Sequence, residues 1–514
     1  MNVHVKIAAA IVVLGLLAAA GYKYLWPRFE ARAQIDTTDA RGTKGRIAIG
    51  VDNWIGYFPL CSDEMRKRMR TAGYVLHCED DKADYPKRFA NVKSNQLQFA
   101  VATVDAYLLN GPAAGFPGAI VAVIDESKGG DAIVGWKDKI GSLDGLKAPR
   151  TPTIAFTPGS PSEHLLRSAA VHFDVPALRG GKGPWRIETN GSSEALKRLL
   201  DRKTEAAVLW EPDVTRALGT PGVIKLLSTA ETQRLIIDVL IASRTVLQQE
   251  PEMIKTLLGT YFDVARHYRE NPEALANDVA AETKLPMAQV KPMLAGVAWT
   301  GLTDNFQTWL GATPDTNGMV DVIRSTLRIL TETGALPADP LPDQDPYRII
   351  NSQFVGATFT ATATGMQRGA AAANPALDQH FKELADDEWA RLREIGTLKA
   401  LNVSFQSGTA DLSYDGKTEI DAMMEVLRHY PGFRVRVRGH TAQSGDPDLN
   451  RALSLERADA VARYMNVTYN VDPNRVKVVG VGSAQPLPRA PNESDRAYQY
   501  RLPRVEVSLL ADSF

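Results

Sequence analysis

The chain has 514 residues, which is too long for a single core and predicts two to four domains. With 44% hydrophobic and 23% charged residues it has the composition of a globular protein, not of a disordered one. A formal net charge of −1 provides no bulk positive field and argues against a nucleic-acid partner. The eight histidines are scattered and none stands at metal-ligand spacing from Cys or Glu, so we expect no metal and no cofactor.

The N-terminus carries a charge-free apolar run from Ile7 to Tyr22. As a helix it would span about 24 Å, somewhat short of a hydrocarbon core of roughly 30 Å. The aromatic residues that follow extend it and suit the membrane interface. Small residues at 18–20 leave a cleaved signal peptide as the alternative. We expect a retained inner-membrane helix over 1–26 and a tether over 27–45, with the bulk of the chain in the periplasm of a Gram-negative bacterium.

The first globular segment opens with a strand, Arg46 to Val51, followed by a helix with a basic face and a second strand, Tyr74 to Cys78. Cys61 lies in the first turn of that helix, and Cys78 ends the second strand. In a right-handed βαβ unit both positions fall at one edge of the sheet. We therefore predict a disulfide, which would contribute about 3 kcal/mol in an oxidising compartment, with two separate buried thiols as the alternative.

Further along, Phe99 to Thr103 is a predicted strand, Ala119 to Ile124 a predicted crossover into a second lobe, and Leu226 to Leu240 the return. Thr153 to Phe156 is a short strand, and the turn after it opens a helix at about Pro161. The Gly and Ser residues of this turn bring backbone N–H groups and hydroxyls to the positive end of a helix dipole, which is a generic anion-binding device.

Ligands in open α/β sheets bind at the carboxyl ends of the strands, so polar residues at strand ends are the candidates for a binding site. The candidate ligand-binding residues are Asp52, Trp54, Tyr57, Thr103, Asp105, Gly159, Ser160, Ser162 and Glu211. Trp54 and Tyr57 could equally be packing residues. The hydroxyls suit an anion and the carboxylates suit an amine, so a small polar ligand that is anionic or zwitterionic is expected.

Three stretches resemble periplasmic solute-binding proteins of the nitrate/sulfonate/taurine group. They are Asp131 to Leu166 (DAIVGWKDKIGSLDGLKAPRTPTIAFTPGSPSEHLL), Val51 to Leu60, and Glu194 to Leu218, which contains Trp-Glu-Pro. The resemblance implies a two-lobed α/β domain of the type II periplasmic-binding-protein fold over 46–347, with its second lobe at about 125–226. It also implies a small-molecule ligand and an ABC permease as a partner.

The chain then changes character. Pro251 to Ala298 is predicted to be helical, and a Pro- and Asp-rich stretch ending at Tyr347 closes the domain. Phe354 to Asn374 is rich in small residues and is predicted to be a linker. Pro375 to Leu398 is predicted to be an amphipathic helix, so that 348–397 form a linker and helix between domains.

The C-terminal residues 398–514 predict alternating strands and helices and contain the patterns F-x-S-G-x-x-x-L-S, P-G-x-x-V-x-V-x-G-H-T and N-x-x-L-S-x-x-R-A in order. They resemble the OmpA-like peptidoglycan-binding domain. In that family an Asp after Gly-His-Thr holds the ammonium of the peptidoglycan diamino acid, and this chain has Ala442 there. The resemblance implies Asn450, Arg457 and Arg504 as the retained site residues, with Arg457 pairing with the ligand's carboxylate.

Losing one charged hydrogen-bond partner costs about 1.5–3 kcal/mol, so peptidoglycan binding is expected to be weakened, or the domain serves assembly alone. The sequence thus predicts a membrane-anchored periplasmic solute-binding protein with an envelope-associating domain. A structural scaffold or sensor in a complex with other envelope proteins is the alternative. The same superfamily includes a thiamine-pyrimidine synthase that depends on a Cys-rich motif, and with only two cysteines this chain is not expected to be an enzyme.

Overall fold

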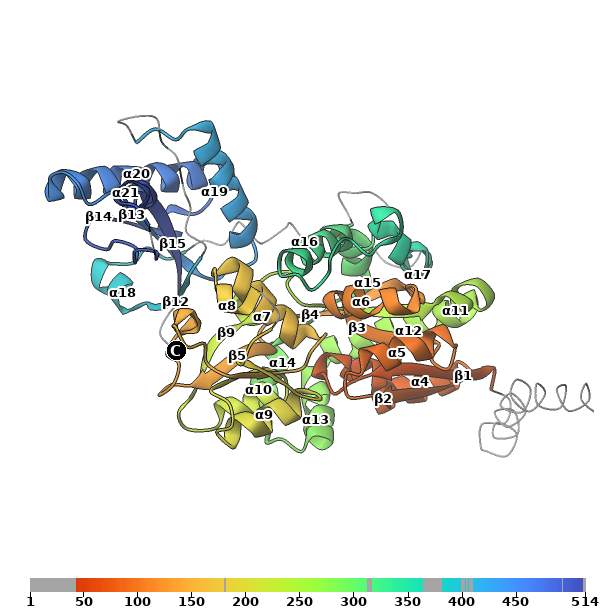
Figure 1. Ribbon diagram of the computed structural model, residues 1–514. Helices are drawn as coiled ribbons and strands as arrows, with labels where there is room; N and C mark the ends of the chain where they lie inside the picture. The colour runs from red at the N-terminus through yellow and green to blue at the C-terminus, as the bar shows by residue number, and fades with distance from the viewer. Residues whose placement is uncertain are drawn as a thin grey trace, which may run out of the picture.

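A computed structural model describes residues 43–179, 182–311, 317–363, 381–398, 403, 405, 410–491 and 493–511. The expected membrane segment 1–26, most of the expected tether and residues 364–380 lie outside this set. Within it, no helix is long and apolar enough to cross a membrane. The described part of the chain is built on sheets of six, five and four strands, coloured mainly red to green, yellow and blue in Figure 1.

The six-stranded sheet forms the first lobe, in the order β11-β4-β10-β3-β1-β2. Its strands are β1 (Gly45–Val51), β2 (Tyr74–Asp80), β3 (Phe99–Thr103), β4 (Gly118–Ser127), β10 (Ile237–Ser243) and β11 (Val297–Trp299). β1 pairs in parallel with β2 and β3, whereas β10 returns antiparallel between β3 and β4. β4 and β10 are buried along their whole length, as expected for apolar strands covered on both faces.

The five-stranded sheet forms the second lobe, in the order β7-β6-β8-β5-β9. Its strands are β5 (Asp131–Trp136), β6 (Ile154–Phe156), β7 (Arg186–Glu188), β8 (Ala206–Trp210) and β9 (Val223–Ser228). The helices of this lobe are α7 (Pro161–His172), α8 (Pro176–Arg179), α9 (Ser192–Leu200) and α10 (Asp213–Leu218). α7 begins where predicted, because Ser160 caps it and Pro161 occupies the first helical position.

Two short segments, 128–130 and 229–236, carry the chain between the lobes. The return crossover lies where the sequence indicated. Ala119 to Ile124, predicted as the outward crossover, is instead part of core strand β4, and the chain crosses only after Ser127. A buried apolar run that fills a strand cannot also be a solvent-exposed connection, which explains the correction. The two-lobed α/β arrangement itself is confirmed.

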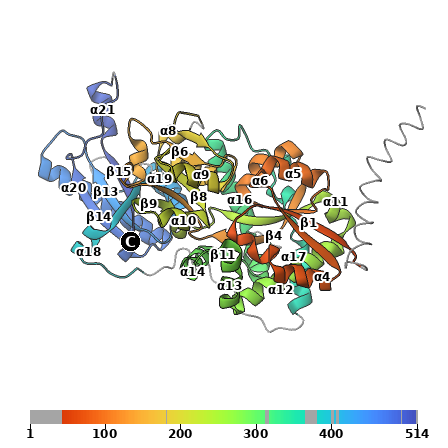
Figure 2. The same ribbon diagram turned by 90° about the horizontal axis from the view of Figure 1, so that it is seen from below.

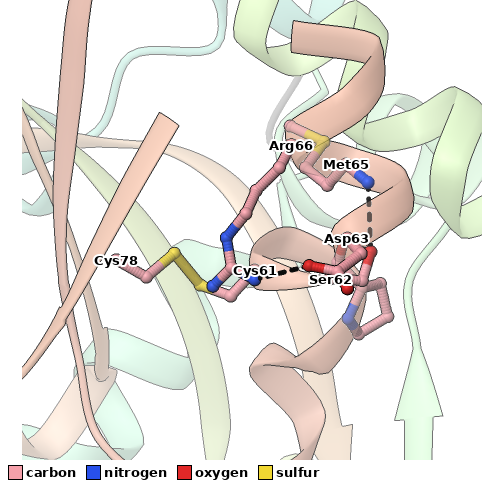
Figure 3. Close-up of a disulfide and its surroundings, with 7 residues drawn as sticks. Cys61, Ser62, Asp63, Met65, Arg66 and Cys78 are labelled. Carbon is pink, nitrogen blue, oxygen red and sulfur yellow. Dashed lines mark hydrogen bonds and ion pairs between the residues drawn. A yellow bond between two sulfur atoms is a disulfide. The ribbon is translucent and has the colours of Figure 1, made fainter. Parts of the chain in front are cut away.

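Cys61 and Cys78 form a disulfide, with Cα atoms 6.1 Å apart, that ties the helix α3 (Phe58–Cys61) to β2 (Figure 3). Directly after Cys61, Ser62 caps the helix α4 (Asp63–Thr71) by accepting a hydrogen bond from the backbone N–H of Met65. The bridge therefore fixes the first crossover helix at the edge of the first lobe's sheet.

The helices that complete the first lobe follow β10. They are α11 (Arg244–Gln249), α12 (Pro251–Glu270), α13 (Pro272–Thr283), α14 (Met287–Ala295), α16 (Gly318–Glu332) and α17 (Gln353–Ala363). Two predictions fail here. Val297 begins the edge strand β11, although the helix was expected to reach Ala298. Part of the expected linker forms α17, whose Phe354 and Val355 are buried in the core of the first lobe.

The four-stranded sheet has the order β12-β15-β13-β14. Its strands are β12 (Arg393–Thr397), β13 (Arg434–His440), β14 (Val476–Gly482) and β15 (Arg504–Ala511), and its main helices are α18 (Asp386–Arg391), α19 (Tyr414–Leu427), α20 (Pro447–Tyr469) and α21 (Asp495–Arg501). The helix predicted from Pro375 to Leu398 is present only as α18 among the described residues, and its C-terminal end is instead β12, which pairs antiparallel with β15. Strand pairing overrides an amphipathic pattern of this length.

The four-stranded domain packs directly on the second lobe, beside α7 and α8 in Figure 1 and beside α8 in Figure 2. Tyr430 lies against the end of α7, where its hydroxyl is 2.6 Å from Nδ1 of His172 and its ring makes an edge contact with Phe173. His429 stacks on His172 and exchanges two hydrogen bonds with Gln233 of the return crossover. This domain therefore contacts both the second lobe and the segment about which the lobes would move.

Candidate functional site

The space between the lobes is lined by residues from strand ends on both sides. Four of the predicted residues meet there, namely Asp52, Trp54, Tyr57 and Thr103. The structure adds Tyr85, Asp131, Pro161, Trp210, Ile236 and Asp238 to the lining. Asp52 follows β1 and Thr103 ends β3, so both lie at the carboxyl ends of strands, where ligands bind in open α/β sheets.

Asp52 is held by a buried cation. Arg88, which is fully buried on the helix α5 (Tyr85–Lys93), places one guanidinium nitrogen 3.1 Å from Asp52 and 2.5 Å from Asp81. Tyr85 also donates to Asp52, at 3.3 Å. A buried carboxylate needs such partners to remain charged.

A second pair of carboxyl groups, Asp125 and Asp238, lies deeper in the first lobe. The indole N–H of Trp54 donates to Asp125 at 3.2 Å, and the hydroxyl of Tyr57 donates to Asp238. Gly56 leaves room for the contact between Trp54 and Asp125, because a Cβ there would collide with both. Burial, and then the charges of neighbouring aspartates, raise the pKa of both carboxyl groups well above the ordinary value, because a low-dielectric environment disfavours the ionised form.

Asp105 and Asp131 each have one buried carboxylate oxygen without a hydrogen-bond partner among the described residues. Both side chains are nearly inaccessible, at 2% exposure. Burial raises the pKa of each to about 7, and the charge of Asp105 contributes to the raised pKa of Asp131. Such orphaned oxygens are costly in a folded protein and would be satisfied by a donor from a ligand.

Glu211 lies at the end of β8, but its carboxylate caps α10. Its oxygens accept from the backbone N–H and the hydroxyl of Thr215, at 3.0 and 2.8 Å. Burial raises its pKa to about 7. Glu211 contributes to the acidic character of the cleft without lining it.

The predicted anion-binding turn is occupied by its own side chains. Glu163 accepts the backbone N–H of Gly159 at 2.7 Å, and Ser160 donates to the carbonyl of Thr157 while accepting from the N–H of Ser162. The hydroxyl of Ser162 donates to Val208 in β8, at 3.3 Å. Although burial opposes it, neighbouring Arg167 and the Gly159 N–H lower the pKa of Glu163, so a carboxylate already takes the place of an anion at this helix end.

The lobes touch across the cleft. Trp210 of the second lobe donates to Asn53 at 2.9 Å, and Asn110 of the first lobe donates to the carbonyl of Gly159 at 3.0 Å. The space left among the lining residues measures about 10 Å³, close to the minimum for a single water. A ligand larger than that requires the lobes to open about the two crossing segments.

The sequence interpretation did not single out Asp125, Asp131 and Asp238 as site residues. Asp238 interrupts the apolar run LIIDVLIAS, whereas Asp125 ends the apolar run in AIVAVIDES and Asp131 begins the one in GGDAIVGW. An ionisable residue inside a strand that is buried on both faces is expensive and therefore a signal of function. No group of described residues has the arrangement of a metal-ion site.

The second candidate site lies in the four-stranded domain. Arg457 on α20 is half-buried, with its guanidinium 4.9 Å from the ring centre of Phe405 and its Nε without a partner among the described residues. Asn450 donates to the carbonyl of Ser444 at 3.0 Å. The guanidinium of Arg504 already has partners within the domain, because it donates to Glu506 and to the carbonyls of Leu502 and Gln485. Asp446 caps α20 and cannot readily replace the carboxylate missing at Ala442.

Residues 404–499 match the family model described as the OmpA family. The C-terminal part of the chain is an OmpA domain. Relatives of this part include the Probable lipoprotein YiaD of Escherichia coli (strain K12), 36% identical over 108 residues, and the Peptidoglycan-associated lipoprotein of Rhizobium meliloti (strain 1021), 26% identical over 125 residues. These alignments cover 21% and 24% of this chain and only 48% and 62% of the relatives.

Solved structures similar to the two lobes include the periplasmic aliphatic sulphonate binding protein SsuA from Escherichia coli, with a TM-score of 0.45 and 16% identity over 58% of this chain and 95% of that one. A putative sulfonate-binding SsuA from Methylobacillus flagellatus KT has a TM-score of 0.47 and 13% identity over 63% and 96%. The lobes of the present chain are defined by their own sheets and crossings, independently of these similarities.

Proposed function

We propose that this chain is an envelope-associated solute receptor whose two lobes close on a small amine-bearing ligand, either a cation or a zwitterion. The observation that carries the proposal is the convergence of buried aspartates on the closed cleft. Asp131, which lines the cleft, and Asp105, whose charge acts on Asp131, each have a carboxylate oxygen without a hydrogen-bond partner among the described residues. The helix end that could have held an anion is already occupied by Glu163. An ammonium group supplies the donors and the charge that this cleft lacks.

The raised pKa values of Asp105 and Asp131, both about 7, make the proposal specific. A bound ammonium stabilises the ionised form of each carboxyl group, so binding releases protons and strengthens as the pH rises through 7. A sulfonate would have the opposite pH dependence, because it is repelled by ionised carboxylates. The direction of the pH dependence therefore reports the charge of the ligand.

The test is titration calorimetry with 1,4-diaminobutane, glycine and methanesulfonate between pH 5.5 and 8. The amine-bearing probes should bind, and Asp131→Asn should weaken their binding about tenfold, the usual loss for one charge-assisted hydrogen bond. Asp138→Asn is the matched control, because Asp138 is an exposed aspartate of the same lobe, paired with Arg202. Binding of methanesulfonate alone, unaffected by Asp131→Asn, would refute the proposal.

The proposal includes a location. The bulk of the chain would lie in the periplasm, attached to the inner membrane through 1–26, and would act without catalysis, either beside an ABC permease or with other envelope proteins. The disulfide supports an oxidising compartment, and the charge-free run from Ile7 supports attachment. A phosphatase fused after Gly45 should be active outside the cytoplasm, and the protein should remain in the membrane fraction after a salt wash.

A second candidate function is a sensor that reports ligand to the cell wall. The observation in its favour is that α7 reaches from Pro161 in the cleft to His172 at the OmpA domain, while Gln233 of the crossover bonds to His429. Weak binding of peptidoglycan through Arg457 is part of this proposal. If the amine probe changes the amount of protein that purified sacculi retain, the sensor is favoured over a simple transport receptor.

A further inference from the structure

A second cavity lies where three parts of the chain meet. It has a volume of about 720 Å³ and is lined by residues of α16 of the first lobe, of the return crossover, and of the end of α19 in the OmpA domain. Figure 1 labels α16 and α19. This volume is in the range of small-molecule sites, about 300–1,000 Å³. Arg234, Arg324, Arg328 and Arg428 contribute to its wall, and we refer to it as the arginine cavity.

Two of these arginines stand one turn apart on α16. Arg324 and Arg328 are both exposed on the same helix face, and like charges at this spacing destabilise a helix. Neither guanidinium has a hydrogen-bond or ion-pair partner within the part of the chain that the structure describes. Their positive charge is directed at the cavity and is not neutralised by the helix itself.

Arg234 faces them from the crossover segment. Its guanidinium lies 5.1 Å from the ring centre of Trp309, and its backbone N–H donates to Glu126 at 2.6 Å, which holds the residue in place. Stacking on an indole leaves the outer edge of a guanidinium free to bind an anion.

The acidic residues of the wall do not balance these charges. Glu425 is paired with Arg428 at 2.8 Å, which leaves Asp321 against the other three arginines. The excess positive charge affects a neighbouring histidine, because burial lowers the pKa of His429 and the charge of Arg328 lowers it further. The same charge contributes to the lowered pKa of buried His172, after burial and the charge of His429.

We propose that the arginine cavity binds a small polyanion, a molecule carrying phosphoryl groups or several carboxylates. Each guanidinium can take one anionic group in bidentate fashion, so several arginines around one cavity favour a ligand with at least two such groups. The bound polyanion would join the first lobe, the crossover and the OmpA domain. This site is independent of the cleft and of the amine ligand proposed for it.

The experiment is titration calorimetry of the full chain with pyrophosphate and with citrate, using acetate at matched ionic strength as the monoanion. Saturable binding of either polyanion, absent with acetate, is expected. Pyrophosphate alone would identify a phosphoryl ligand, and citrate alone a polycarboxylate. The double variant Arg324→Gln with Arg328→Gln should weaken binding at least tenfold, and Arg234→Gln should weaken it several-fold.

The matched control is Arg266→Gln, an exposed arginine on α12 paired with Asp263, which should leave polyanion binding unchanged. The double variant should keep the binding of 1,4-diaminobutane seen with the wild type, since its residues lie outside the cleft. Failure of both polyanions to bind, equal binding of acetate, or undiminished binding by the double variant would each overturn the proposal.

Discussion

The cleft between the lobes and the candidate site of the OmpA domain have opposite charge balances. The cleft between the lobes has more buried carboxyl groups than cations. Arg88 balances Asp52, while one oxygen each of Asp105 and Asp131 has no hydrogen-bond partner among the described residues. The OmpA domain lacks the carboxylate expected at Ala442, and the Nε of Arg457 there has no hydrogen-bond partner within the part of the chain that the structure describes. The comparison teaches that resemblance locates a site, whereas the inventory of unpaired charges decides which ligand it suits.

The largest expected effect is the loss of stability on removing Arg88, the buried cation that pairs with Asp52 at the cleft. Arg88→Met removes the guanidinium and leaves Asp52 and Asp81 buried without their partner, which should lower the free energy of unfolding by about 3–5 kcal/mol. Chemical denaturation at pH 7 measures it. Arg266→Met, which breaks an exposed pair, should cost less than about 1 kcal/mol. Equal losses in both variants would mean that the cleft's charges are not buried as described.

The OmpA domain should respond to restoration of the missing charge. Ala442→Asp returns a carboxylate for the ligand's ammonium and should strengthen binding to purified sacculi by about 1.5–3 kcal/mol. Arg457→Ala should abolish whatever binding the wild type has. Sedimentation with sacculi provides the measurement. If the wild type binds and neither change matters, the wall is contacted through another surface of the domain.

The cleft should also show a characteristic pH dependence. Asp105 and Asp131 have folded-state pKa values of about 7 against ordinary values of 3.8, so between pH 4 and 7 the folded state binds more protons than the unfolded state. Their contribution to stability is therefore present at low pH and lost as the pH rises through 7. Asp131→Asn removes one such group. Its free energy of unfolding, relative to that of the wild type, should therefore rise by about 2 kcal/mol from pH 5 to pH 8. If the variant instead became more stable relative to the wild type as the pH falls, the raised pKa of Asp131 would be contradicted.

The smallest expected effect is a change in the pKa of His429 when the positive charge of Arg328 is removed. Arg328→Gln removes one of the positive charges that lower the pKa of His429, so the pKa should rise towards 6.5. An NMR titration of the histidine ring signals detects the change. Arg324→Gln, on the same helix face, should have a smaller effect. An unchanged His429 in Arg328→Gln would show that this guanidinium is screened from the domain contact.

Local sequence determined much of this protein. The strand β1, the Ser160 cap of α7, the order of elements in the OmpA domain and the position of Asp52 at a strand end all follow from short-range patterns of apolar, capping and turn residues. These features depend on neighbours in the chain, and local chemistry is sufficient to specify them.

The tertiary structure decided the rest. Strand β12 replaced an expected helix because β15, more than a hundred residues away, offers it a pairing edge. Asp125 and Asp238 are paired across β4 and β10 of the first sheet, and only the approach of the second sheet brings Asp131 to the same cleft as Asp238. The sequence predicted an anion site at the turn around Ser160, but in the folded chain the Glu163 carboxylate accepts the hydrogen bond of the Gly159 N–H there. Charge neutralisation depends on distances in space, and these distances are set by the packing of segments that are remote in the chain.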